Sequence, residues 1–225
     1  MTQNPLIIVI GAYGSGKSEL SINLAIKLKQ EGHEKVSLVD LDVVNPYFRS
    51  RDVQYLLAQD GIEVISAESG YGLADLPMIS PRSKGAINDK SKAVILDVGG
   101  DPPGCKVLRR FEDDIKNREY EMIFVVNTKR PFTSAVNEII EMKEMLESIS
   151  TLKITEIVCN ANLLEQTDIN LVSDGVALVK QVAEKEKLLF KNYLVMNDSI
   201  NFYPDEIDGI KKMNLSYFLS KPWEL

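Results

Sequence analysis

The chain has 225 residues, which suffices for one substantial α/β domain and is marginal for two. Hydrophobic residues make up 44% and charged residues 26% of it, as in ordinary soluble proteins, and no apolar run approaches the roughly 20 residues of a membrane span. The formal net charge of −7 argues against bulk attraction to nucleic acid or anionic lipid. Met1–Pro5 carries no basic region of the kind that opens a signal peptide. We therefore expect a single cytoplasmic domain over residues 1–225, with neither nucleic-acid nor membrane partners.

Apolar runs typical of strands alternate with helical patterns along the whole chain. The strand-like runs are Leu6–Ile10, Lys35–Asp40, Glu63–Ser66, Ala93–Val98, Glu121–Asn127, Thr155–Asn160 and Leu188–Met196. Apolar residues at helical spacing follow the first run and recur most clearly over Ser134–Ser150 and Ile169–Glu186. This alternation predicts an α/β fold: a three-layer, doubly wound, mostly parallel sheet of about seven strands. Ligands of such sheets bind at the carboxyl ends of the strands.

The longest stretch without a clear element is about Ala67–Lys92, which holds several glycines and prolines. Loops of this length are uncommon unless they are functional. The stretch is therefore interpreted as a lid or a partner-contacting segment, with a short helix as the alternative.

The loop after the first strand fits the phosphate-binding P-loop pattern G-x-x-x-x-G-K-[ST] at every fixed position, from Gly11 to Ser18. Its glycines let backbone N–H groups approach the phosphates, and the following helix points its positive end at them. Lys17 is expected to act in catalysis by reaching the β- and γ-phosphates, and the Ser18 hydroxyl to ligate Mg²⁺. A glycine-rich turn without a ligand is the weaker interpretation. The predicted nucleotide-binding residues of this segment are Gly11, Tyr13, Gly14, Ser15, Gly16, Lys17, Ser18 and Glu19.

Acidic residues end two other predicted strands. Asp40 and Asp42 follow the second strand and Asp97 ends the fourth, and a carboxylate buried there without a partner would be costly. Because Mg²⁺ prefers oxygen ligands and keeps several waters, Ser18, Asp42 and Asp97 are candidate metal ligands. Asp42 is also the candidate catalytic residue that positions water, with Asp40 in support, and Asp97 has a turn or helix cap as its alternative role. Gly100 completes a D-x-x-G pattern whose backbone N–H can sense the γ-phosphate.

Together, the P-loop, the Asp-Leu-Asp after the second strand and the Asp-Val-Gly-Gly after the fourth resemble the MinD/ParA/CobQ-type nucleotide-binding domains of the SIMIBI class. The resemblance covers roughly residues 5–200 and implies the P-loop NTPase fold with ATP as the nucleotide. It also implies that Asp42 orients the attacking water and that Asn160 belongs to the adenine pocket. A turn-forming asparagine is an equal alternative for Asn160. The guanine-binding N-K-x-D motif is absent, because residues 160–163 lack its lysine and its aspartate.

The sequence departs from this family inside the P-loop. Ala12 occupies the position where these proteins usually carry a second lysine, which reaches the partner's phosphates in a nucleotide-sandwiched dimer. A lysine acting in trans is therefore not supported, and a homodimer stays an open alternative. Other positive groups that could act on the transition state are Arg49, Arg51, Lys106 and Arg109, among which the sequence does not choose.

Two further features of the chain lie where known members of the class carry functional groups, and both favour a structural role here. The segment 211–223 is interpreted as packing against the domain rather than as a membrane-binding helix, because Pro222 interrupts it. Cys105 lies where the nitrogenase iron protein has a cluster ligand. Iron–sulfur binding is disfavoured, because the other cysteine, Cys159, belongs to an apolar strand.

The function predicted first is an Mg²⁺-dependent ATPase that acts as a nucleotide switch for an unidentified partner. The alternative is an ATP-dependent small-molecule synthetase or kinase, similar to cobyrinic acid synthase or dethiobiotin synthetase, with Arg82 and Lys84 in a lid over the phosphates. A non-catalytic nucleotide-binding adaptor is a third hypothesis, and the complete set of Lys17, Ser18 and Asp97 argues against it. No motif indicates the partner or the substrate.

Overall fold

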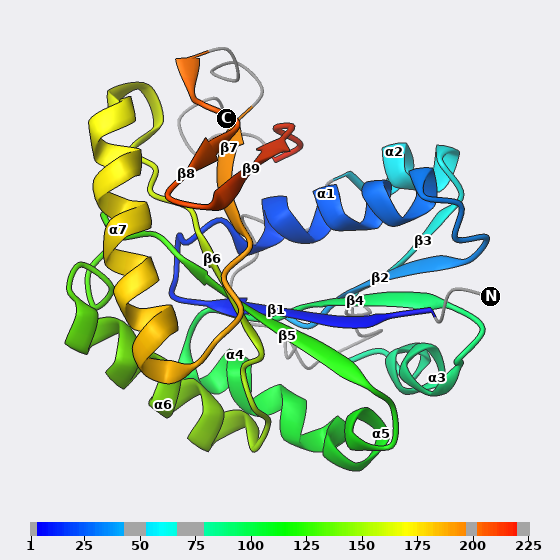
Figure 1. Ribbon diagram of the computed structural model, residues 1–225. Coiled ribbons are helices and arrows are strands. Elements are labelled where there is room, and N and C mark those ends of the chain that lie inside the picture. The colour runs from blue at the N-terminus through cyan, green and yellow to red at the C-terminus, as the bar shows by residue number, and fades with distance from the viewer. Residues whose placement is uncertain (1–3, 43–52, 67–78, 197–201, 220–225) are drawn as a thin grey trace, which may run out of the picture.

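The computed structural model describes residues 4–42, 53–66, 79–196 and 202–219 (Figure 1). Within these ranges nine strands form one sheet in the order β3-β2-β4-β1-β5-β6-β7-β9-β8, and every neighbouring pair is parallel except β8 with β9. The strands are β1 (Leu6–Gly11), β2 (Val36–Asp40), β3 (Ile62–Ile65), β4 (Ala93–Asp97), β5 (Tyr120–Val126), β6 (Glu156–Cys159), β7 (Asn192–Met196), β8 (Glu206–Ile207) and β9 (Ile210–Leu215). The helices are α1 (Lys17–Gln30), α2 (Gln54–Gln59), α3 (Arg82–Asn88), α4 (Pro102–Lys106), α5 (Glu112–Lys116), α6 (Val136–Ser150) and α7 (Ile169–Glu186), with 3₁₀ turns η2 (Val107–Phe111) and η3 (Leu164–Gln166). None of these helices is both long and apolar enough to span a membrane.

The α/β fold class predicted from the sequence is confirmed, and each of the seven predicted runs overlaps an observed strand. The expected number of about seven strands was too low, because β9 and β8 extend the sheet beyond β7. Only the end residues of β9, Ile210 and Leu215, are buried, and Lys211 and Asn214 between them are exposed. A strand with so polar a middle leaves no continuous apolar run in the sequence.

The structure describes parts of two segments for which the sequence allowed more than one interpretation. Residues 82–88 of the expected long loop form α3, so the alternative of a short helix is right for this part. The rest of the expected lid, residues 67–78, lies outside the described residues. The segment after β9 packs on the sheet face that carries α1, through Phe218 and Leu219. Residues 220–223 lie outside the described part of the chain.

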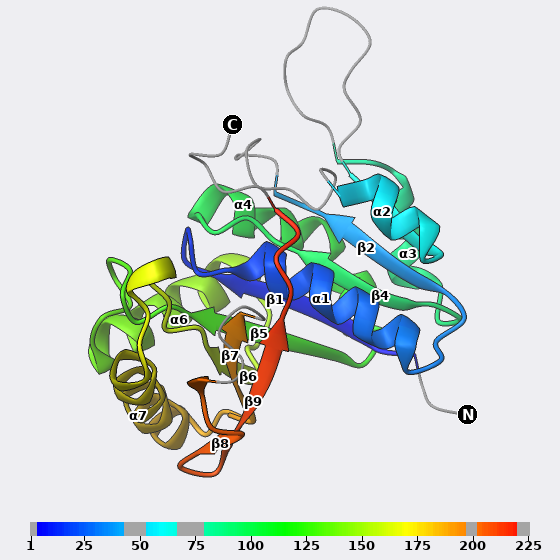
Figure 2. The ribbon, with the colours of Figure 1, turned by 90° about the horizontal axis from the view of Figure 1, so that it is seen from above.

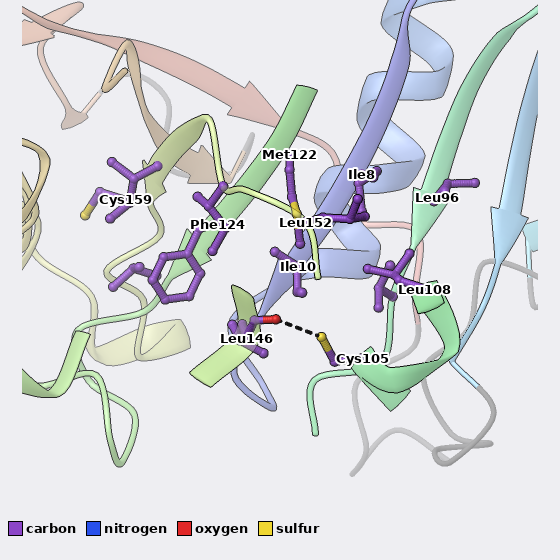
Figure 3. Packing of buried hydrophobic residues seen from close by; sticks show 14 of the residues in the cluster. Ile8, Ile10, Leu96, Cys105, Leu108, Met122, Phe124, Leu146, Leu152 and Cys159 are labelled. Atoms are coloured by element: carbon purple, nitrogen blue, oxygen red, sulfur yellow. Dashed lines mark hydrogen bonds between the residues drawn. The ribbon is translucent and has the colours of Figure 1, made fainter. Parts of the chain in front are cut away.

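Helices cover both faces of the sheet, which gives the three predicted layers (Figures 1 and 2). On one face, α1 buries Leu20, Leu24 and Leu28, which are spaced four residues apart and so lie on one side of the helix. On the other face, α3 to α7 pack over a larger apolar cluster, part of which Figure 3 shows. Cys105 of α4 lies in this cluster, and its thiol donates a hydrogen bond to the Leu146 carbonyl of α6 at 3.6 Å. Because apolar side chains cover both faces of the sheet, we expect the polar groups of a binding site at the edge formed by the carboxyl ends of its strands.

The carboxyl ends of four neighbouring strands meet at that edge. Asp40 at the end of β2 pairs in register with Asp97 at the end of β4, and Asp97 pairs with Val9 of β1. On the other side of β1, Gly11 pairs with Val125 of β5. The loops that follow β1, β4 and β5 are therefore brought side by side with Leu41 and Asp42, the described residues after β2.

A buried arginine joins three segments at the opposite edge. Arg118, between α5 and β5, is 5% exposed. Its guanidinium donates to five backbone carbonyls at distances between 2.5 and 3.2 Å; these belong to Asn4, Pro5, Ile87, Asp89 and Lys92. The start of β1, the end of α3 and the start of β4 are thus held by one side chain.

A charged cluster ties β3 to its neighbours and gives a testable pH dependence. The Glu63 carboxylate accepts hydrogen bonds from Lys92 and Ser37 at 2.8 Å and from Arg82 at 2.6 Å. The bond from Lys92, aided by those from Arg82 and Ser37, lowers the pKa of Glu63 from 4.5 to about 2. A depressed pKa means that the stability is present above the unfolded value and is lost as the pH falls toward the folded one.

We therefore expect Glu63→Gln to lower the free energy of unfolding at pH 7 and to lose this effect as the pH falls from 4.5 toward 2. The pKa difference would correspond to roughly 3 kcal/mol, but water screens the partly exposed carboxylate, so we expect about 1 kcal/mol. Urea unfolding of both proteins between pH 7 and pH 3 measures the difference, with the exposed Glu34→Gln as the control. A difference that stays constant over this range would contradict the assignment.

Candidate active site

The P-loop lies between β1 and α1 in the geometry that its sequence predicts. Gly14 and Gly16 have φ of 71° and 93°, in the left-handed region that glycine adopts without strain. A Cβ on Gly16 would collide with the side-chain amide of Asn160, so no larger residue fits there. The Asn160 amide also donates a hydrogen bond of 2.8 Å to the Ser15 carbonyl. Asn160, at the end of β6, therefore holds the shape of the loop.

Lys17, the first residue of α1, is buried against the loop that it follows. Its ammonium group donates to the Ala12 carbonyl at 3.0 Å. Burial lowers the pKa of Lys17, and the charges of Asp97, Asp42 and Asp101 oppose this by raising it. Gly100 lies directly beside the group, since a Cβ at that position would be 2.6 Å from the Lys17 ammonium nitrogen. The segment after β4 and the P-loop thus meet at Lys17.

The two acidic strand ends converge on the same place. Asp97 is buried; its Oδ1 accepts a hydrogen bond from the Ser21 hydroxyl at 3.1 Å, and its Oδ2 is buried without a hydrogen-bond partner among the described residues. Burial raises the pKa of Asp97 to about 6, against the lowering effects of the Ser18 hydroxyl and the Lys17 charge. Asp40 fixes the neighbouring backbone, because its Oδ1 accepts from the Asp42 amide at 3.1 Å. The charge of Asp42 acts on both Lys17 and Asp97.

This donor set fits a magnesium ion. The Asp97 carboxylate carries an unused buried oxygen, the Ser18 hydroxyl is nearby, and both are hard oxygen ligands of the kind that Mg²⁺ prefers. Within the described ranges, no group of three or more His, Cys, Asp or Glu side chains could hold a metal alone. A protein site of one or two ligands is typical of Mg²⁺, which completes its shell with water and phosphate oxygens.

Glu19 has a structural contact that its sequence position did not indicate. Its carboxylate accepts backbone hydrogen bonds from Phe218 and Leu219, the shortest at 2.9 Å, and burial raises its pKa to about 7. One turn further along α1, the Asn23 side chain bonds both backbone groups of Ser216. The segment 216–219 thus crosses over α1 next to the P-loop (Figure 2). The partners lie 193 to 200 residues away, so no local pattern could have predicted them.

Of the four positive groups considered from the sequence, the structure describes Lys106 and Arg109. Arg109 donates to the Ile149 and Ser148 carbonyls at the end of α6, and Lys106 is exposed. Arg49 and Arg51 lie outside the described residues. The group that does lie against the loop is Arg130, in the turn after β5: a Cβ on Gly14 would be 3.2 Å from its Nε. Its place at the carboxyl end of a parallel strand was the signal that could have identified it.

Both described cysteines belong to the core. Cys105 and Cys159 are fully buried and form no disulfide. Burial raises the pKa of each thiol to about 12. Because both side chains are enclosed in the apolar core, neither is exposed to bind a cluster in the folded protein.

The fold and this geometry define a P-loop protein with the fold of the nucleoside triphosphatases. No protein-family model matches the chain. It is similar to two proteins described as cytosolic Fe-S cluster assembly factor Nubp2 homologs, from Drosophila ananassae (29% identical) and Drosophila virilis (28%). Each match covers 180 residues, 77% of this chain, and 60% and 59% of the two relatives. The chain therefore spans about three fifths of the length of these relatives.

Solved structures share the fold. FtsY from Thermotoga maritima superposes with a TM-score of 0.59 at 19% identity, covering 87% of this chain and 63% of that one. The 54 kDa signal recognition particle protein of Aeropyrum pernix, in complex with GDP, gives 0.59 at 16% identity over 86% and 42%. A nucleotide-binding protein of Archaeoglobus fulgidus, in complex with ADP, gives 0.51 at 18% identity over 88% and 85%. At these identities the likeness establishes the fold alone.

Proposed function

We propose that this chain binds ATP with Mg²⁺ and hydrolyses it, as a cytoplasmic nucleotide switch of the MinD/ParA/CobQ type. One observation carries the proposal: Lys17, the unpartnered oxygen of Asp97 and the charge of Asp42 meet beside the P-loop. A buried carboxylate oxygen without a donor is costly in a structural role, and a bound cation removes the cost.

Each residue then has one task. Lys17 exchanges its bond to the Ala12 carbonyl for the β- and γ-phosphates and stabilises the charge on the transferred phosphoryl group. Ser18 and Asp97 would hold Mg²⁺, which neutralises the phosphate oxygens when bound. With a pKa of about 6, the Asp97 carboxylate is mostly ionised at neutral pH and so able to bind a cation. Asp42 orients the attacking water, and the Gly100 amide responds to the γ-phosphate.

Two parts of the proposed function, the nucleotide base and the partner, rest on observations outside the site. Adenine is proposed because the guanine-binding motif is absent and because of the resemblance to the MinD/ParA/CobQ-type domains. The Drosophila relatives are named as factors of cytosolic Fe-S cluster assembly, and a protein of that process is one class of partner for the switch. The buried thiols of Cys105 and Cys159 support a role in which the described core holds no cluster of its own.

Asp42→Asn tests the function. We expect phosphate release from Mg²⁺·ATP to fall about 100-fold, the usual contribution of a group that handles the proton or position of water, with ATP affinity little changed. Phosphate release and equilibrium ATP and GTP binding are measured together, with the exposed Asp60→Asn as the control. Wild-type turnover in the Asp42 variant would remove Asp42 from the mechanism. Absence of ATP binding by the wild-type chain would overturn the proposed function.

A further inference from the structure

The turn between β5 and α6 brings a second cation to the phosphate loop. At Gly14, where a Cβ would lie 3.2 Å from Nε and 3.3 Å from Cζ of Arg130, the guanidinium packs directly on the loop backbone. The N–H groups of a P-loop face the phosphates of its nucleotide. A guanidinium that lies against Gly14 is therefore beside the loop that would carry the β- and γ-phosphates.

The backbone of this turn is fixed by buried polar side chains. Asn127 Oδ1 accepts from the Lys129 amide at 3.0 Å, and its Nδ2 donates to the Asn162 carbonyl at 2.9 Å. The Thr133 hydroxyl, which is fully buried, donates to the carbonyls of Asn127 and Arg130 at 2.8 and 3.2 Å. The Arg130 amide itself donates to the Asn127 carbonyl at 3.1 Å. These hydrogen bonds thus fix the backbone from which the side chain of Arg130 extends.

The same turn contains a strained backbone conformation, which is a common feature of functional sites. Phe132 has φ of 65°, which a bulky residue rarely adopts, and its side chain is 72% exposed, so packing of the ring does not compensate for the strain. Strained residues persist where the surrounding hydrogen bonds over-determine the backbone, and they gather at functional sites. Here the bonds of Asn127 and Thr133 impose the conformation that places Arg130.

The described charged groups around Lys17 are mostly negative, so another cation would be favourable there. Asp42, Asp97 and Asp101 all act on Lys17. Within the parts of the chain that the structure describes, Arg130 forms no ion pair that would neutralise it. A bound triphosphate adds several negative charges beside these three carboxylates, against which stand Lys17 and the Mg²⁺ of the proposed function. An arginine held at the loop by its own chain would balance the charge that develops during phosphoryl transfer.

We propose that Arg130 is a catalytic residue that acts in cis, contacting the γ-phosphoryl group of the bound nucleotide and stabilising the transition state of its transfer. The inference rests on the proposed ATPase function. It predicts an effect that depends on the γ-phosphate, because ADP lacks the group that Arg130 contacts. A residue that merely supported the loop would affect ATP and ADP alike.

The test compares Arg130→Ala and Arg130→Lys with the neighbouring exposed Lys129→Ala. We expect Arg130→Ala to lower kcat at saturating Mg²⁺·ATP about 1000-fold, as removal of an arginine that stabilises phosphoryl transfer does. Its Kd for Mg²⁺·ADP should change less than about threefold, whereas binding of Mg²⁺·ADP with fluoroaluminate, which mimics the transferred group, should weaken about 100-fold. Arg130→Lys should fall between, because lysine keeps the charge but lacks the planar fork of donors.

The outcomes separate the two proposals. If wild type and Lys129→Ala hydrolyse ATP and Arg130→Ala does so equally well, the role of Arg130 is overturned and the ATPase function stands. Equal weakening of ADP and of the fluoroaluminate complex also overturns it, in favour of a structural role. If wild type binds ATP without turnover, the ratio of ADP to fluoroaluminate affinity still decides on Arg130. If wild type binds no nucleotide, both proposals fail.

Discussion

Lys17→Ala is expected to weaken the binding of Mg²⁺·ATP about 100-fold or more. The ammonium group is the buried cation beside the P-loop and would donate charge-assisted hydrogen bonds to two phosphates. Such bonds contribute roughly 1.5–3 kcal/mol each, and 1.4 kcal/mol corresponds to a factor of ten. The variant should also lose the nucleotide-induced rise in thermal stability, which in wild type grows with the ratio of ligand concentration to Kd. Isothermal calorimetry and thermal unfolding with and without Mg²⁺·ATP measure both effects.

Lys27→Ala is the matched control for this prediction. It removes the same side chain from the same helix, but Lys27 is exposed and makes only a long ion pair of 3.9 Å with Glu31. The control should bind ATP as wild type does. An affinity of Lys17→Ala within threefold of wild type would mean that nucleotide binds away from the P-loop.

Arg118→Ala is expected to be the most destabilising change outside the site, lowering the free energy of unfolding by about 3–5 kcal/mol. The guanidinium is buried and serves five backbone carbonyls from three segments. Alanine cannot donate to them, and a carbonyl left buried without a donor loses its hydrogen bond without regaining water. Urea denaturation followed by circular dichroism measures the loss.

The exposed Arg110→Ala provides the comparison, with an expected change within about 0.5 kcal/mol. Arg118→Lys should recover only part of the stability, since one ammonium group cannot reach carbonyls on all three segments. A loss below 1 kcal/mol for Arg118→Ala would show that water replaces the guanidinium at this edge.

The features that the sequence predicted well are the ones that local pattern determines. The buried parallel strands are continuous apolar runs, so β1 and β4 were placed within one or two residues of their observed ends. The P-loop is a contiguous motif with its strand and helix beside it. Because parallel strands carry their ligand-binding loops at one edge, the proximity of Asp42 and Asp97 to Lys17 also followed from the fold class.

The rest depends on contacts between distant residues. The Asn160 amide reaches the Ser15 carbonyl across 145 residues, and nothing near Asn160 indicates whether it would face the loop or a base. Its role in adenine binding stays a prediction, now beside an observed role in holding the loop. Arg130 was missed because its relation to Gly14 exists only after β5 pairs with β1. The polar strand β9 was missed because backbone pairing with β7 places it in the sheet. Backbone pairing of this kind leaves no apolar pattern in the sequence of β9.

The contact between α1 and the segment 216–219 also has a consequence for the order of protein synthesis. The ribosome makes the P-loop first, and the backbone groups that bond Glu19 and Asn23 are made some 193 to 200 residues later. Until then, the first turns of α1 lack the cover of Phe218 and Leu219. A nascent chain therefore contains the whole phosphate-binding motif well before it can form the finished site, and we expect nucleotide to be captured only after residues 216–219 have been made.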